Sequence, residues 1–175
     1  MKRLLISTSA VLLTILSGES TAGAQGASGA HLGLSGAAVF PTGAASRDSA
    51  IGWGGSLMAI FNPPNSPVSV RAEGMYGVMD PTSSRNATRV KVSSGTANVV
   101  ASRRGLSDVL YFIGGIGAYN GDFGGMSHTR FGWNAGGGIA FPLKSGSSIF
   151  VEARYHSVQS ADRFIFIPVS VGFVF

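Results

Sequence analysis

The chain has 175 residues, a formal net charge of +5 and no cysteine, and only 12% of its residues are charged. Ordinary soluble domains carry about 25% charged residues, so the composition argues against a freely soluble protein. The mild positive excess gives no reason to expect a nucleic-acid partner, and the lack of cysteine excludes a fold held together by disulfides. The length suits one domain.

The first 24 residues have the pattern of a secretory signal peptide. Lys2 and Arg3 precede an apolar run over residues 4–16, and small and polar residues then lead to an A-x-A sequence ending at Ala24. The run is too short for a transmembrane helix, which needs about 20 residues. We therefore predict a signal peptide over residues 1–24 with cleavage between Ala24 and Gln25, and a short lead over residues 25–29.

The segments that follow, taken in chain order, alternate between apolar residues and small or polar ones, which is typical of strands with one apolar face. The predicted strands are residues 30–40, 51–61, 68–77, 93–102, 108–120, 130–141, 148–158 and 165–175. Residues 130–141 show the pattern most clearly, because Phe131, Trp133 and Ile139 alternate with glycines and Asn134. The faces of residues 93–102 and 108–120 stay unassigned, since small residues and glycines blur the alternation there.

Short and long connections alternate between these strands. Tight turns begin near Asn62, Ser102 and Pro142, and the largest loop is predicted over residues 78–92, with another over residues 121–129. Repeated hairpins of this kind predict an all-β fold, an eight-stranded antiparallel up-and-down transmembrane β-barrel over residues 30–175. An even number of strands places both ends and the short turns on one side, expected to be the periplasm, with the long loops outside.

The distribution of charge indicates which face meets lipid. The charged residues within the well-defined strands all lie on the face opposite the apolar one: Arg71, Glu73, Arg130, Glu152 and Arg154. That face is otherwise Gly, Ser and Asn, too poor in charge for the water-facing surface of a soluble barrel. We place it inside, because a charge on the lipid face costs about 2–4 kcal/mol at the middle of the membrane. Aromatic residues near the strand ends add two girdles: Phe61, Phe141 and Phe175 at one end, and Phe40, Trp53, Tyr76, Phe131 and Tyr155 at the other.

Four stretches resemble the outer-membrane β-barrel domain family, of the OmpA/OmpX-like small-barrel kind. They are YFIGGIGAYN (residues 111–120), FGWNAGGGIAFPL (131–143), IFVEARYHS (149–157) and IPVSVGFVF (167–175). The resemblance implies a bacterial outer-membrane location and a final strand read by the barrel assembly machinery. The residues that would carry this assembly signal are Ile167, Val169, Val171, Phe173 and Phe175. Pro168 departs from the pattern, because it lacks a ladder donor, and it would mark a bulge or the outer end of pairing.

Two pairs of charged residues form the candidate site. Arg71 with Glu73, and Glu152 with Arg154, are spaced two apart and therefore point inward together. An eight-stranded barrel is just wide enough for side chains to fill it, so we expect an ion-pair network that plugs the lumen. A gate, a proton path or a narrow channel is the transport alternative.

Catalysis and metal binding find weaker support. His156 and Ser157, with Glu152 on the same strand, suggest the residue types of a hydrolase, and lipid A deacylases of the outer membrane use such a set. However, His156 and Ser157 are neighbours in a strand and therefore point to opposite faces. The His-x-Ser spacing of the deacylases is also missing. His31 and His128 stand apart, with no acidic residue or cysteine at ligand spacing, so we expect no metal and no cofactor.

The sequence therefore favours a non-enzymatic barrel with a structural or surface-interaction role, and we expect it to be a monomer. Its expected partners are outer-membrane lipid, lipopolysaccharide and the assembly machinery. The cations of the largest predicted loop, Arg85, Arg89 and Lys91, are the candidates for contact with lipopolysaccharide phosphates.

Overall fold

The computed structural model describes residues 29–43, 46, 49–64, 66–82, 89–104, 108–123, 126–144, 146–159 and 163–175; the predicted signal peptide, with Ala24 and Gln25, lies outside them. Eight strands form: β1 (Ala30–Thr42), β2 (Gly52–Phe61), β3 (Val68–Met79), β4 (Val90–Arg104), β5 (Val109–Phe123), β6 (Met126–Pro142), β7 (Ser148–Val158) and β8 (Phe164–Val174). Within the described residues, no helix is long and apolar enough to cross a membrane.

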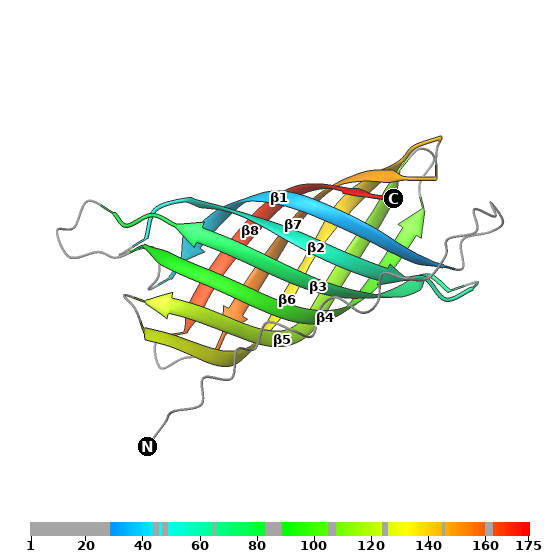
Figure 1. Cartoon of the computed structure of the whole chain (residues 1–175). Helices are drawn as coiled ribbons and strands as arrows, with labels where there is room; N and C mark the ends of the chain where they lie inside the picture. The colour runs from blue at the N-terminus through cyan, green and yellow to red at the C-terminus, as the bar shows by residue number, and fades with distance from the viewer. Residues whose placement is uncertain are drawn as a thin grey trace, which may run out of the picture.

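The strands close into one antiparallel barrel. Each strand pairs with its neighbours in sequence, and β1 pairs with β8 to complete the wall. Figure 1 shows blue β1 beside red β8, with the strands inclined to the long axis of the barrel. The predicted eight-stranded up-and-down barrel is thus confirmed, and closure satisfies the backbone hydrogen bonds that a membrane would otherwise leave unpaired.

The two faces of the wall follow the predicted alternation. Large apolar side chains cover the outside, including Leu57 at 68% exposure and Phe112 at 77%. Polar side chains, among them Arg71, Glu152 and Asn134, are buried inside. The structure also assigns the two strands whose sequence was ambiguous: Val99 of β4 and Phe112 of β5 face outward, whereas Asn98 and Tyr111 face the lumen. An apolar exterior of this extent is stable only when something other than water covers it.

The predicted loop over residues 121–129 is wrong. Strand β5 runs to Phe123 and β6 begins at Met126, so a two-residue connection joins them. The sequence of this part of the hairpin shows no regular apolar alternation, and residues 127–129 are exposed, so the sequence pattern could not distinguish it from a loop. The predicted loop over residues 78–92 is too long, since β3 extends to Met79 and β4 begins at Val90. Here the added strand residues Met79, Val90 and Val92 are buried and apolar.

Pro168 interrupts one ladder without shifting its register. The β7–β8 pairs Ala153↔Val169 and His156↔Phe166 share one register, but no pair joins the positions between them. On the other side, β8 pairs with β1 without a break, through Val39↔Pro168. Phe175 exchanges both backbone hydrogen bonds with Leu32 of β1, so even-numbered residues of β8 direct their backbone groups toward β7. The gap therefore lies where the missing N–H of Pro168 would have pointed, and the proline marks no bulge.

Candidate functional site

The four charged residues singled out from the sequence meet inside the barrel. Strand β3 supplies Arg71 and Glu73, and β7, on the opposite side of the wall, supplies Glu152 and Arg154. Their two-residue spacing directs both members of each pair into the lumen. Each of the four side chains is at most 4% exposed.

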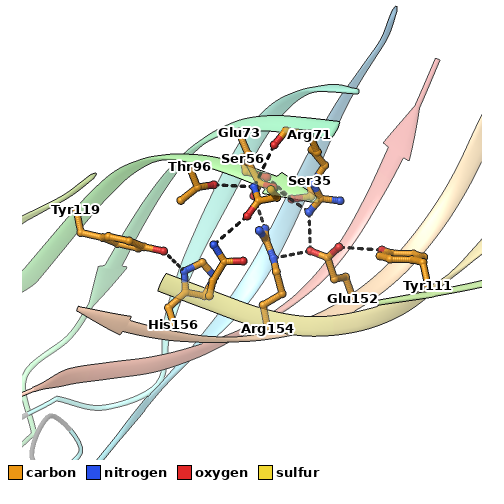
Figure 2. A network of polar contacts seen from close by, with 12 residues as sticks. Ser35, Ser56, Arg71, Glu73, Thr96, Tyr111, Tyr119, Glu152, Arg154 and His156 are labelled. Atoms are coloured by element: carbon orange, nitrogen blue, oxygen red, sulfur yellow. Dashed lines mark hydrogen bonds and ion pairs between the residues drawn. The ribbon is translucent and has the colours of Figure 1, made fainter. Parts of the chain in front are cut away.

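The charges alternate around a closed ring, which Figure 2 shows from close by. Arg71 Nη2 lies 2.8 Å from Glu73 Oε2 and 2.7 Å from Glu152 Oε1. Arg154 completes the ring, because its Nε lies 2.7 Å from Glu152 Oε1 and its Nη2 contacts Glu73 Oε1. Two arginines and two glutamates leave the ring with no formal net charge, which makes burial of four ionised groups tolerable.

Neutral polar side chains surround the ring, and the sequence analysis did not select them. Tyr111 donates its hydroxyl to Glu152 Oε2 at 2.9 Å, and Asn98 donates to the carbonyl of Arg71 at 3.2 Å. Asn134 in turn donates to Asn98 Oδ1 at 2.9 Å. The alternation of residues 130–141 indicated the lumen-facing position of Asn134, whereas the faces of Asn98 and Tyr111 were unassigned from the sequence. Contacts across the barrel depend on its closure and could not be predicted.

Glycines of β6 make room for these side chains. A Cβ atom on Gly138 would lie 2.5 Å from the Tyr111 hydroxyl, and one on Gly136 would lie 2.6 Å from Cγ of Arg154. Real Cβ atoms do not approach other atoms so closely. The glycine run in FGWNAGGGIAF therefore permits the ring and its tyrosine to fit the narrow lumen.

Apolar side chains occupy the lumen on either side of the polar layer. Toward the end with the longer connections, buried residues pack into one cluster: Val39, Met75, Met79, Val90, Val92, Tyr119, Val158 and Phe166. Toward the end with the short turns, Val100, Tyr111 and Ile113 form a second cluster. The ion-pair ring thus lies between two apolar clusters of the lumen.

The residues considered for hydrolysis do not form a catalytic arrangement. His156 points into the lumen, where its Nδ1 lies 2.9 Å from the Tyr119 hydroxyl and its ring stacks on Phe166 with centroids 4.8 Å apart. Ser157 lies on the other face of β7, where alternation directs it away from His156. Glu152 is engaged by the ring. Among the described residues, no cluster of three or more His, Asp or Glu side chains could hold a metal ion.

The other predicted residues lie at the ends and on the outer face of the barrel. His31 is at the start of β1 and His128 near the opposite end, in β6. Arg130 has the lumen-facing parity predicted for it, but it is exposed because β6 extends beyond the packed interior there. The predicted assembly residues Ile167, Val169, Val171 and Phe173 occupy the outward face of β8, and Phe175 follows that strand.

The cations of the predicted loop have different surroundings. Arg85 lies outside the described residues. Arg89 makes an exposed ion pair with Asp80, with 2.8 Å between Nε and Oδ1. Lys91 belongs to β4, where it is exposed and shares the outward parity of Val99.

A closed antiparallel barrel with an apolar exterior, aromatic side chains near both ends and a polar layer in its lumen is a transmembrane β-barrel of the bacterial outer membrane. The sequence agrees with this class, because residues 8–175 match the family model described as outer membrane protein beta-barrel domain. The chain belongs to this family, and its location is the outer membrane.

Solved structures show the same fold. Neisserial surface protein A is 17% identical, with a TM-score of 0.69, and the match covers 86% of this chain and 98% of that one. The outer membrane protein Ail of Yersinia pestis, in a nanodisc, is 18% identical with a TM-score of 0.51, covering 84% and 100%. The N-terminal barrel domain of Pseudomonas aeruginosa OprF is 12% identical with a TM-score of 0.51, covering 83% and 97%. No curated protein matches the sequence.

Proposed function

We propose that this protein is a non-enzymatic outer-membrane barrel whose lumen is closed, and that it acts in envelope structure or in interactions at the cell surface. The observation that supports this most directly is the ring of Arg71, Glu73, Glu152 and Arg154, in which every charge is paired across the lumen. Apolar clusters on both sides of the ring add two further barriers to water and ions.

Single-channel recording tests the closed lumen. The folded protein is reconstituted into planar bilayers beside a water-filled porin as a positive control, and we expect no stable conductance. The physical reason is that an ion would have to displace paired charges at the ring and cross apolar layers that offer it no polar ligands. A reproducible, long-lived conductance from the wild-type protein would contradict the proposal and favour the narrow channel.

The non-enzymatic part of the proposal has its own test. A hydrolase built on His156 would need that side chain near a nucleophile, whereas it contacts Tyr119 and Phe166 inside the barrel. Mass spectrometry of lipid A should give identical acyl patterns from cells that carry the protein and cells that lack it. Loss of an acyl chain that depends on the protein, and disappears in His156→Ala, would support the deacylase instead.

The proposed partners follow from the outer surface. Lys91 is an exposed cation on the outward face near the long-loop end of β4, at a level where an anionic headgroup could neutralise it. We therefore propose contact between Lys91 and lipopolysaccharide phosphates, which bind ammonium groups as point charges. Arg89 is less available because it is paired with Asp80. We also propose that the barrel assembly machinery recognises the outward residues of β8 and that the folded protein is a monomer.

A further inference from the structure

Strand β6 extends beyond its neighbour β7 at the long-loop end of the barrel. Its first pair with β7 is Gly132↔Val158, and beyond that pair one backbone bond remains, from the N–H of Gln159 to the carbonyl of Phe131 at 2.9 Å. On its other side, β6 pairs with β5 all the way to Phe123↔Met126. Figure 1 shows this yellow-green hairpin reaching past the ends of β7 and β8. Residues 127–130 of β6 thus have one open edge among the described strands.

The direction of the backbone groups on this edge follows from the printed ladder. Phe131 directs its carbonyl toward β7, and alternate residues of a strand direct their backbone groups to the same side. The N–H and C=O of Thr129 and Ser127 therefore point away from β5, to the open side. Residues 127–131 are all exposed, so the described part of the chain leaves them open.

The open edge is held in strand conformation before any partner arrives. Behind it, β5 pairs with β4 up to Val90↔Phe123, and β4 pairs with β3 up to Met79↔Val90, so a sheet of several strands supports the hairpin. On one face Asn120 joins the two strands of the hairpin, donating to Thr129 Oγ1 at 3.0 Å and accepting from Ser127 Oγ at 2.6 Å. A preformed edge reduces the entropy lost when another strand is added to it.

The charges beside the edge are basic. Arg130 and His128 share the opposite face of β6, and Arg163 is exposed where the chain enters β8. Asp80, an acidic residue at this end of the barrel, already forms an ion pair with Arg89. Among the side chains that the structure describes, an added strand would therefore meet a net positive charge. A second copy of this edge would bring Arg130 near another Arg130, which disfavours self-pairing.

We propose that the open edge of β6, residues 127–130, binds an extended acidic segment of a partner protein, which adds as a strand beside β6 beyond its last described bond to the end of β7. Backbone hydrogen bonds to Ser127 and Thr129 would supply affinity, and acidic side chains opposite Arg130 and Arg163 would supply selectivity. This inference gives the proposed surface role a site and a class of partner.

A defined peptide tests the proposal on the full-length folded protein in detergent micelles. The probe is a fluorescein-labelled octapeptide that alternates glutamate with valine, and fluorescence anisotropy measures its binding. We expect saturable binding that weakens about tenfold in Thr129→Pro, because proline removes an N–H on the open side while the β5 ladder stays intact. Thr129→Ala is the matched control, because it loses the same hydroxyl but keeps the N–H, and it should bind more tightly than Thr129→Pro.

Two further measurements separate strand addition from simple charge attraction. The same peptide with N-methyl groups at alternate residues keeps its charge but loses its backbone donors, so we expect about tenfold weaker binding. In the wild type, the amide resonances of Ser127 and Thr129 should shift on titration.

Several results would overturn the proposal. These are a lack of saturable binding, an unchanged affinity in Thr129→Pro, or equal binding of the lysine version of the peptide. A dimer in sedimentation that Thr129→Pro abolishes would identify a second copy as the occupant instead. The conductance and lipid A experiments do not involve this edge, so their outcome and this one are distinguishable.

Discussion

The glutamates of the lumen illustrate how residues of opposite charge depend on one another inside a barrel. Glu152 lies within 2.7 Å of both arginines of the ring and also accepts from Tyr111. Removing four charges from water is costly, and their mutual attraction compensates only while all are present. The loss of one member is therefore more damaging than the ring's net contribution to stability would indicate.

Glu152→Gln tests this dependence. The change keeps the shape of the side chain but leaves the buried ring with an excess positive charge, so we expect a loss of about 3–5 kcal/mol in the free energy of unfolding. Tryptophan fluorescence during urea unfolding in lipid vesicles measures it, since Trp53 and Trp133 are exposed on the outside. The control Asp80→Asn breaks an ion pair that is at least 51% exposed and should cost at most about 1 kcal/mol. Equal losses in the two variants would contradict the closed ring.

At the scale of elements, β8 has two separate tasks. Its outward face carries the predicted assembly residues, while its backbone closes the barrel against β1. Phe175 takes part in both, because its side chain is exposed and its backbone exchanges two hydrogen bonds with Leu32, at 2.9 and 3.3 Å. A truncation would remove both contributions at once, so a side-chain substitution is the sharper test.

In Phe175→Ala, the backbone bonds to Leu32 can still form, but the terminal aromatic is lost. We expect export to proceed and outer-membrane assembly to fall, so that unfolded protein accumulates in the periplasm. Cell fractionation with heat-modifiable gel migration measures the folded share. The control Phe141→Ala removes an aromatic from the same end of the barrel, on β6. Normal assembly of Phe175→Ala, or an equal defect in Phe141→Ala, would refute a specific signal.

The whole molecule is positioned in the bilayer by charges on its outer wall, and β4 shows this best. Its outward positions carry Lys91 near one end and Arg103 near the other, with uncharged residues between them. Twelve residues of strand rise about 40 Å, and a tilt of about 40° reduces this to about 30 Å, the thickness of the hydrocarbon core. The two cations therefore bracket the lipid-facing part of the strand.

Ala97 lies midway between these cations and is exposed. Ala97→Arg should destabilise the barrel by about 2–4 kcal/mol, because it places a charge at the middle of the membrane. Equilibrium unfolding in vesicles of defined lipid measures the loss, and Gln159→Arg, at an exposed position beyond β7, should change it little. A loss below about 1 kcal/mol for Ala97→Arg would contradict the lipid-facing assignment.

The sequence by itself determined the number of strands, their order and most of their faces, because a wall between lipid and a narrow lumen requires alternation at every residue. It also selected Arg71, Glu73, Glu152 and Arg154, since a charge within the lipid-spanning part of a strand is costly unless it points inward. Only the tertiary structure decided that these four close a ring, because their contacts cross the lumen between β3 and β7 and depend on barrel closure. It likewise decided the length of the β5–β6 hairpin and the open edge of β6, where both faces lie beyond the packed interior and no apolar pattern marks the strand.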